Sequence, residues 1–186
     1  MTHSQKIDTR KLTYLAILTA IVVVLQAIGN YFAVPIAGFS ISISLSLVPI
    51  VIAATVRGPL AGGWLGLVSA GVILLFNGAT FFLTLSFFGT VLVVIVKGVL
   101  CGLVAGLVYK LISKKSKIAA VYVASAVCPI VNTGIFFIGG LIFFTDIMAI
   151  IYASALVNFT FELIVNIVLS PSVVRIIDTV NKSKAN

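Results

Sequence analysis

The chain has 186 residues, of which 61% are hydrophobic and 9% charged, and its mean hydropathy is +1.30. A soluble domain with a polar surface does not reach these values, so the composition indicates an integral membrane protein. The formal net charge of +8 would suit a nucleic-acid-binding protein. However, the basic residues separate apolar runs instead of gathering with aromatic residues on one element, so we expect no nucleic-acid partner.

The apolar runs predict an all-α protein with six transmembrane helices in one membrane domain, residues 1–186. The first run is long enough to span the hydrocarbon core and longer than the apolar region of a signal peptide. Residues 35–46 (PIAGFSISISLS) alternate small, polar and apolar residues, which favours a structured loop or a short strand. The second helix is short, so we expect its start to be irregular or surrounded by protein instead of lipid. The predicted helices are 12–34, 44–56, 60–76, 89–111, 118–142 and 149–173.

The turn between the second and third helices carries Arg57, followed by GPLAGGWLG at residues 58–66. The Gly-Pro pair in this motif ends one helix and begins the next. Gly62 and Gly66 place glycines four residues apart on the new helix, where a neighbouring helix can approach closely.

The basic residues predict the orientation. Of the 12 lysines and arginines, three precede the first helix, one lies in the turn after the second, four surround the turn after the fourth and three follow the sixth. Cytoplasmic segments of membrane proteins carry an excess of Lys and Arg. Both termini are therefore predicted to be cytoplasmic, and the external loops carry no basic residue. The remaining basic residue, Lys97, falls inside a predicted helix.

Lys97 and Glu162 are the ionisable residues within the predicted transmembrane helices. Each costs about 2.5–3.5 kcal/mol at a helix centre on insertion scales, so such residues usually have a partner or a function. Counted at about 1.5 Å per residue from the cytoplasmic helix ends, both lie about 20 Å into the membrane, with Asn132 at a comparable height. Asn158, Glu162 and Asn166 form a polar stripe along the last helix.

Two interpretations of these polar groups remain open. In the first, Lys97 and Glu162 form a structural ion pair between the fourth and sixth helices, and the asparagines bond neighbouring helices. In the second, these groups bind a polar small molecule in a cavity open to the outside. The aromatic segment after the third helix, ATFFLTLSFFGT, is then either a membrane-interface belt or the cover of that cavity. The candidate substrate-binding residues are Lys97, Asn132, Asn158, Glu162, Asn166, Asn77, Phe81 and Thr84.

No motif predicts catalysis, a cofactor or a metal site. His3 lies in the polar N-terminal stretch, where we expect it to be solvated, and the sequence lacks ligand clusters and phosphate-binding glycine loops. Cys101 and Cys128 lie in apolar runs and are expected to be buried, unreactive thiols. We therefore expect the protein not to be an enzyme.

Taken together, these features resemble the substrate-binding S components of energy-coupling factor (ECF) vitamin transporters. The resemblance covers essentially the whole chain. It rests on six helices with both ends inside, on the LAILTA segment with Ala16 and Ala20 four residues apart, and on the GPxxGxxxG turn at residues 58–66.

The resemblance implies a multi-pass, vitamin-binding protein of the bacterial plasma membrane. Such a protein would dock through Ala16 and Ala20 onto a transmembrane coupling (T) subunit that is bound to two ABC-type ATPase subunits. The external loops after the first and third helices would close over the vitamin, and the protein would topple in the bilayer to release it. No pocket residue is carried over from the family, because S components share little pocket sequence.

The segments SISLSLVPIVIAATVRGPLAGGWLG, KGVLCGLVAGLVYKL and CPIVNTGIFF resemble most the branch that includes pantothenate components. Lys97 would suit the carboxylate of pantothenate, and the asparagines its hydroxyls and amide. Riboflavin is the second choice, because a Phe-lined pocket would suit a flat ring, and folate or a pyridoxine-like compound remain alternatives. The alternative outside transport is a structural or assembly membrane protein in which Lys97 and Glu162 only pair.

Overall fold

The computed structural model describes residues 9–31, 34–36, 39–41, 44–76 and 79–185. Helices make up almost all of this part of the chain, and two three-residue strands pair as an antiparallel hairpin in which Val34 is opposite Ile41. The elements in chain order are α1 (Thr9–Tyr31), β1 (Val34–Ile36), β2 (Phe39–Ile41), α2 (Leu47–Arg57), α3 (Pro59–Leu75), α4 (Thr80–Leu85), α5 (Phe87–Ile112), α6 (Lys117–Phe143), η1 (Thr145–Ile147) and α7 (Met148–Ala185).

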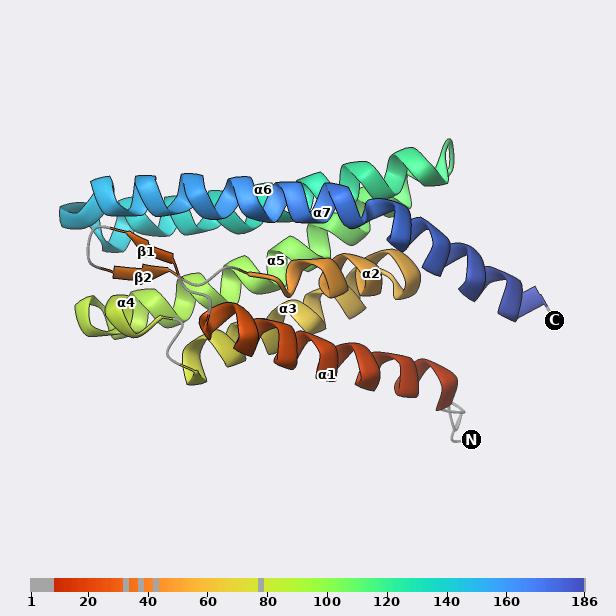
Figure 1. Ribbon diagram of the computed structural model, residues 1–186, viewed down its shortest axis with the longest axis horizontal. Coiled ribbons are helices and arrows are strands. Elements are labelled where there is room, and N and C mark those ends of the chain that lie inside the picture. The colour runs from red at the N-terminus through yellow and green to blue at the C-terminus, as the bar shows by residue number, and fades with distance from the viewer. Residues whose placement is uncertain (1–8, 32–33, 37–38, 42–43, 77–78, 186) are drawn as a thin grey trace, which may run out of the picture.

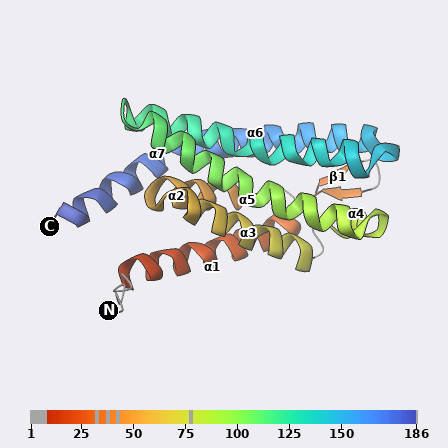
Figure 2. The same cartoon turned by 180° about the vertical axis from the view of Figure 1, so that it is seen from behind.

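The helices form an elongated bundle with distinct ends (Figure 1). Both termini lie at one end, together with the turn between α5 and α6. The β-hairpin, α4 and the connection between α6 and α7 lie at the opposite end. Seen from behind, α5 runs between α6 and α3 (Figure 2), and these are the neighbours against which it packs most extensively.

Several segments differ from the sequence-based boundaries, among them α2, which begins at Leu47 and not at residue 44, and α4, which lies where no helix was predicted. The first predicted helix, 12–34, corresponds to α1, which ends at Tyr31 because the chain enters the hairpin at Val34. The last predicted helix, 149–173, corresponds to α7, which continues to Ala185 through Pro171. The extra turns are held by packing, since Val173 and Ile177 are buried against Val121 of α6. The stretch 35–46, predicted to be a loop or a short strand, contains β2 and all of β1 except its first residue, Val34.

Helix α2 lies at the centre of the bundle. Its 11 residues rise only about 16 Å at 1.5 Å per residue, short of the roughly 30 Å hydrocarbon core. Ile50, Val51, Ala53 and Ala54 of this helix are buried in the main apolar cluster. Protein instead of lipid therefore surrounds α2, as its short length suggested. Pro49 is tolerated because it lies in the first turn, where its missing N–H would have no helical acceptor.

Four helical segments are long and apolar enough to cross a membrane, counted within the described residues: Leu12–Asn30, Phe87–Ile112, Lys117–Phe143 and Thr145–Val180. The apolar helices α2 and α3 are shorter. Large apolar side chains such as Leu75, Phe87, Ile138 and Val168 are exposed on the bundle surface. An outer surface of this kind suits lipid contact, and the structure is that of a helical membrane protein.

The contact between α3 and α5 depends on glycine. A methyl group at Gly66 would overlap the carbonyl oxygen of Gly98, and that oxygen belongs to the backbone and cannot rotate away. The two helix axes can therefore approach this closely only because neither residue has a side chain. Gly98 directly follows Lys97 on α5, so this contact also determines where α5 places Lys97.

The substitution Gly66→Ala is expected to destabilise the protein by about 1–3 kcal/mol, because overpacking must push α3 and α5 apart. Gly71→Ala on the same helix is the matched control, since a methyl group there meets nothing within 4 Å and should stabilise the helix by about 0.5–1 kcal/mol. Thermal unfolding in detergent measures both. Equal midpoints for the two variants would contradict this account of the interface.

Candidate functional site

A cavity lies between α3, α4, α5, α6 and α7 and the residues that precede α2. It contains about 600 Å³ of empty space, part of which is continuous with the outside. Its lining comes from Ser44, Ile73, Ala79, Phe82, Val94, Lys97, Asn132, Thr133, Phe136, Ser154, Ala155, Asn158 and Glu162.

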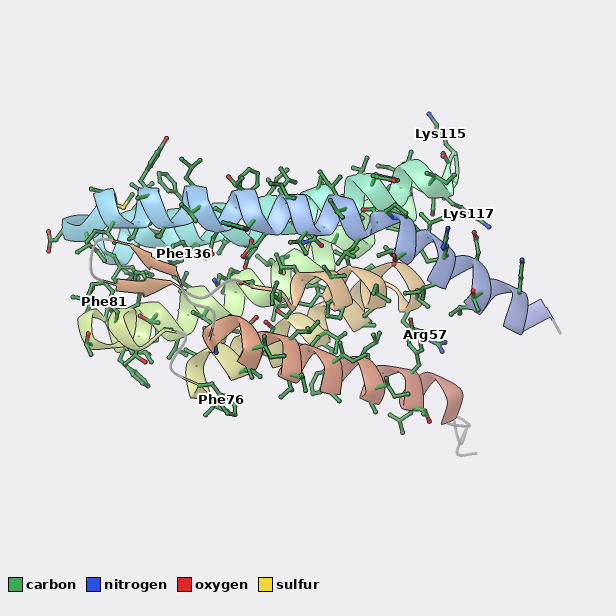
Figure 3. All side chains as sticks on the ribbon, in the orientation of Figure 1. Arg57, Phe76, Phe81, Lys115, Lys117 and Phe136 are labelled. Carbon is green, nitrogen blue, oxygen red and sulfur yellow. The ribbon has the colours of Figure 1, made fainter. Side chains whose placement is uncertain are left out.

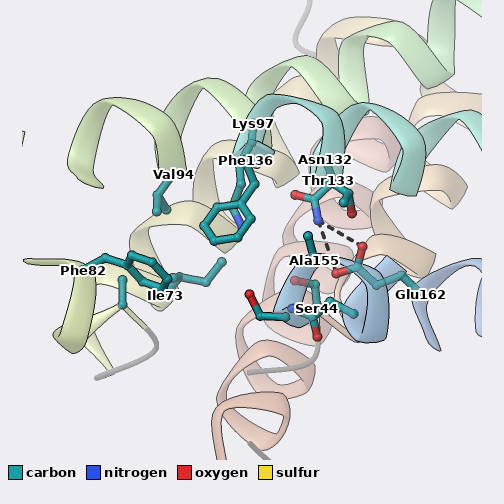
Figure 4. A pocket seen from close by; sticks show the side chains of 13 residues that line it. Ser44, Ile73, Phe82, Val94, Lys97, Asn132, Thr133, Phe136, Ala155 and Glu162 are labelled. Atoms are coloured by element: carbon teal, nitrogen blue, oxygen red, sulfur yellow. Dashed lines mark hydrogen bonds between the residues drawn. The ribbon is translucent and has the colours of Figure 1, made fainter. Parts of the chain in front are cut away.

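The lining is divided into a polar and an apolar part (Figure 4). Asn132, Thr133, Glu162 and Ser44 lie on one side. Phe82, Ile73 and Val94 lie on the other, with Lys97 and Phe136 between the two groups. A cavity of this kind can bind a small molecule that has both a polar and an apolar portion.

Glu162 is held by an amide. Its side chain is 2% exposed, and the Nδ2 of Asn132 donates to both carboxylate oxygens at 3.2 and 3.0 Å. The hydroxyl and backbone N–H of Ser44 also face this carboxylate. A buried carboxylate needs such donors to remain stable away from water. Asn132 thereby joins α6 to α7.

The Lys97 ammonium lies over the ring of Phe136, 5.2 Å from its centroid. An aromatic face at this distance attracts a cation. Lys97 and Glu162 are near enough for their charges to interact, but the hydrogen bonds that join the carboxylate to a neighbouring helix come from Asn132. In the first interpretation Lys97 pairs with Glu162 and the asparagines bond neighbouring helices, and Asn132 makes a bond of that second kind.

The apolar end is built from edge-to-face rings. The Phe82 ring centroid lies 5.4 Å from those of Phe136, Phe81 and Phe144, and each contact is edge-on. This arrangement is a favourable one for aromatic rings. It places α4 against α6 beside the apolar part of the cavity lining.

The predicted site residues fall into four groups. Lys97, Asn132, Asn158 and Glu162 all line the cavity. Asn166 is buried one turn further along α7, where its Nδ2 donates to the Glu162 carbonyl oxygen at 2.8 Å. Phe81 and Thr84 lie on α4 beside the cavity and are not among its lining residues, and Thr84 donates to the Phe81 carbonyl. Asn77 is outside the described residues.

Several lining residues were not predicted. Phe82 lines the cavity in place of Phe81. Neighbouring residues on a helix point in directions about 100° apart, so only one of the two can face the cavity. Phe136 lies four residues after Asn132 on α6, and Ser154 lies four residues before Asn158 on α7. Each therefore shares a helix face with a predicted residue, so the helical spacing in the sequence could have identified both. Ser44 carries no such signal, because it lies in a non-helical stretch whose position depends on the tertiary fold.

In the described part of the chain, no group of three or more His, Cys, Asp or Glu side chains lies close enough together to hold a metal ion. Cys101 and Cys128 are free and buried, as expected. The cavity offers a cation, a carboxylate, amides and hydroxyls to a ligand.

This protein is a helical membrane bundle with a cavity of mixed polarity, an arrangement typical of membrane proteins that bind small molecules. Residues 10–174 match the family described as ECF transporter, substrate-specific component, and the chain belongs to that family. No curated protein matched the sequence. Members are membrane-embedded subunits that bind a transport substrate and associate with the T and ATPase modules of the transporter; they are not enzymes.

Proposed function

We propose that this protein binds pantothenate in the cavity between α5, α6 and α7 and delivers it to an ECF transporter in the bacterial plasma membrane. The observation that carries the proposal is the placement of Lys97. It is the lysine of the cavity lining, and it lies between a polar wall and an aromatic wall. The Lys97 ammonium would bind the pantothenate carboxylate, because charge-assisted hydrogen bonds are the strongest polar contacts available.

The other lining groups suit the rest of that molecule. Asn158, Thr133, Ser44 and Ser154 offer partners for its hydroxyls and amide. The apolar wall around Phe82 would contact its branched methyl groups. Riboflavin stays the second candidate because the same Phe82 and Phe136 rings would stack on a flat heteroaromatic ring. Folate and pyridoxine-like compounds are further alternatives.

The proposed topology has six membrane segments with both termini in the cytoplasm. Arg57, Lys115 and Lys117 lie at the same end of the bundle as the two termini (Figure 3). Under the positive-inside rule this end faces the cytoplasm, which turns the hairpin and α4 to the outside. The short helices α2 and α3 would be the second and third segments. Protein surrounds α2, whereas α3 also exposes Leu60 and Leu75 on the bundle surface.

Helix α1 is the proposed docking surface for the T subunit. Ala16 and Ala20 are exposed, whereas Leu18 and Val22 on the other face are buried in the bundle. Two small residues four apart on an exposed face allow close approach of a partner helix. The two ATPase subunits would then act through the T subunit.

A panel of water-soluble vitamins tests the proposed ligand. Pantothenate at 100 times its dissociation constant is expected to stabilise the purified protein by about 2.7 kcal/mol. Thermal unfolding in detergent measures this shift, with riboflavin, folate and pyridoxine in parallel and pantothenol, which lacks the carboxylate, as the matched control. Stabilisation by riboflavin alone would replace pantothenate with the second candidate. Stabilisation by none of the panel would contradict the proposed ligand class.

A further inference from the structure

A second polar cluster lies outside the cavity lining, between α1, α3 and the start of α2. We call its members, Gln26, Asn30, Ser46 and Ser69, the Gln26 cluster. The Gln26 Oε1 accepts from the Ser46 hydroxyl at 2.7 Å and from the Ser69 hydroxyl at 3.1 Å. The two hydroxyl oxygens are themselves 2.7 Å apart. Gln26 and Ser46 are fully buried.

The cluster continues along α1 to the end of α3. The Gln26 Nε2 donates to the Asn30 Oδ1 at 3.2 Å, and the Asn30 Nδ2 donates to the Phe76 carbonyl oxygen at 3.3 Å. One glutamine therefore connects three separate elements. A buried network in which the amide and both hydroxyls have partners fixes its members in one arrangement, because each lost partner leaves a polar group unpaired away from water.

Ser46 occupies a position where a serine hydroxyl ordinarily caps a helix. It is the N-cap residue of α2, and serine is favoured there because its side chain accepts from the first backbone N–H groups of the helix. In this structure Ser46 makes no side-chain cap hydrogen bond. Its hydroxyl donates to Gln26 instead. Pro49, the third residue of α2, has no N–H to donate to a capping side chain, and Ser46 itself is in the αR region, so its hydroxyl is available to bond Gln26.

The turn before α2 connects Ser46 to the ligand cavity. Ser44, two residues before Ser46, lines the cavity and faces the Glu162 carboxylate. The backbone between them is a tight turn in which the Leu47 N–H donates to the Ser44 carbonyl oxygen at 3.3 Å. Leu47 is itself buried in the main apolar cluster. A shift of Ser46 would therefore carry Ser44 with it, because the turn and Leu47 connect the two residues rigidly.

We infer that Gln26 is a positioning residue for the ligand site: by holding Ser46 against α1 and α3, it fixes Ser44 against Glu162 in the geometry that binds the ligand. Gln26 does not line the cavity and acts only through the 44–47 turn. This inference rests on the proposed function to the extent that the cavity is the ligand site. It adds α1 to the elements that determine affinity, although none of the α1 side chains that the structure describes lines the cavity.

The first test measures pantothenate affinity by calorimetry on the purified protein. Gln26→Met keeps the length of the side chain and removes its polar atoms. It is expected to weaken binding about tenfold, equivalent to about 1.4 kcal/mol. Thr55→Val is the matched control, because Thr55 is a buried hydroxyl on α2 that bonds only to its own helix, at Val51 and Ile52. The control should bind as the wild type does.

A double-mutant cycle separates positioning from general destabilisation. If Gln26 acts through Ser44, then the Gln26→Met/Ser44→Ala double variant binds no more weakly than the weaker of the two single variants. Additive losses, or a Gln26→Met variant that binds with wild-type affinity, would overturn the inference.

A readout without ligand distinguishes failure of the inference from failure of the proposed function. Hydrogen exchange in the peptide covering residues 44–51 should speed up in Gln26→Met and remain at the wild-type rate in Thr55→Val, because the 44–47 turn loses its anchor. If the wild-type protein does not bind pantothenate but exchange is still faster in Gln26→Met than in the wild type, the positioning role is upheld and the proposed ligand is rejected. Unchanged exchange in Gln26→Met would overturn the positioning role whatever the ligand.

Discussion

The substitution Lys97→Ala is expected to weaken pantothenate binding by about 30-fold or more while the protein stays folded. Removing one partner of a desolvated charge pair costs about 2–5 kcal/mol, and each 1.4 kcal/mol is a factor of ten in affinity. The fold should survive because the Glu162 carboxylate keeps both hydrogen bonds from Asn132. Calorimetry measures the affinity, and size-exclusion chromatography in detergent measures the yield of folded protein.

Two comparisons sharpen this result. Lys114→Ala removes an exposed lysine from the turn after α5, and it should bind pantothenate as the wild type does. Pantothenol lacks the carboxylate, so its weak binding should be the same in the wild type and in Lys97→Ala. Loss of folded Lys97→Ala protein would favour the ion-pair interpretation. A folded Lys97→Ala protein that binds pantothenate with wild-type affinity would contradict the role of the ammonium in binding.

The substitution Ala20→Trp is expected to stop vitamin uptake by whole cells and leave pantothenate binding by the purified protein within about twofold of the wild-type value, a difference of less than 0.5 kcal/mol. Ala20 is exposed on α1 and points away from the bundle core. A tryptophan there would hold a partner helix away from α1, because close approach requires small side chains. Radiolabelled uptake and calorimetry measure the two effects separately.

Ala119→Trp provides the matched control for docking. Ala119 is an exposed alanine near the start of α6. This end of α6 lies on the opposite side of the bundle from α1 (Figure 1). Uptake by this variant should be normal. Equal uptake by the Ala20→Trp and wild-type proteins would reject α1 as the docking surface. A loss of binding in Ala20→Trp would instead indicate that the substitution disturbs the fold.

Much of the helical structure could be predicted from the sequence because long apolar runs leave few other structures in a membrane. The positions of α5 and α6 follow the predicted segments within two residues. The end of α7 did not follow, because the polar tail after Pro171 stays helical through burial of Val173 and Ile177 against α6. Tertiary contacts of this kind are not encoded in local hydropathy.

The site could be predicted where it lies on helices and not where it lies between them. Lys97, Asn132 and Glu162 were identified because a charged or amide group in an apolar helix is costly and so requires a partner. Their placement around one cavity agrees with the matching depths counted along the helices. Ser44 could not be identified, since its position is determined by a turn and by Gln26 on another helix. The amide partner of Glu162 also depended on the relative rotation of α6 and α7.

A structure of the protein saturated with pantothenate tests the central claim most directly. The account predicts ligand density in the cavity, with the carboxylate beside the Lys97 ammonium and the branched methyl groups against Phe82. Ser44 and Glu162 should contact the polar remainder of the molecule. Density for bound pantothenate elsewhere on the protein, with the cavity between α5, α6 and α7 empty, would contradict the assignment of this site.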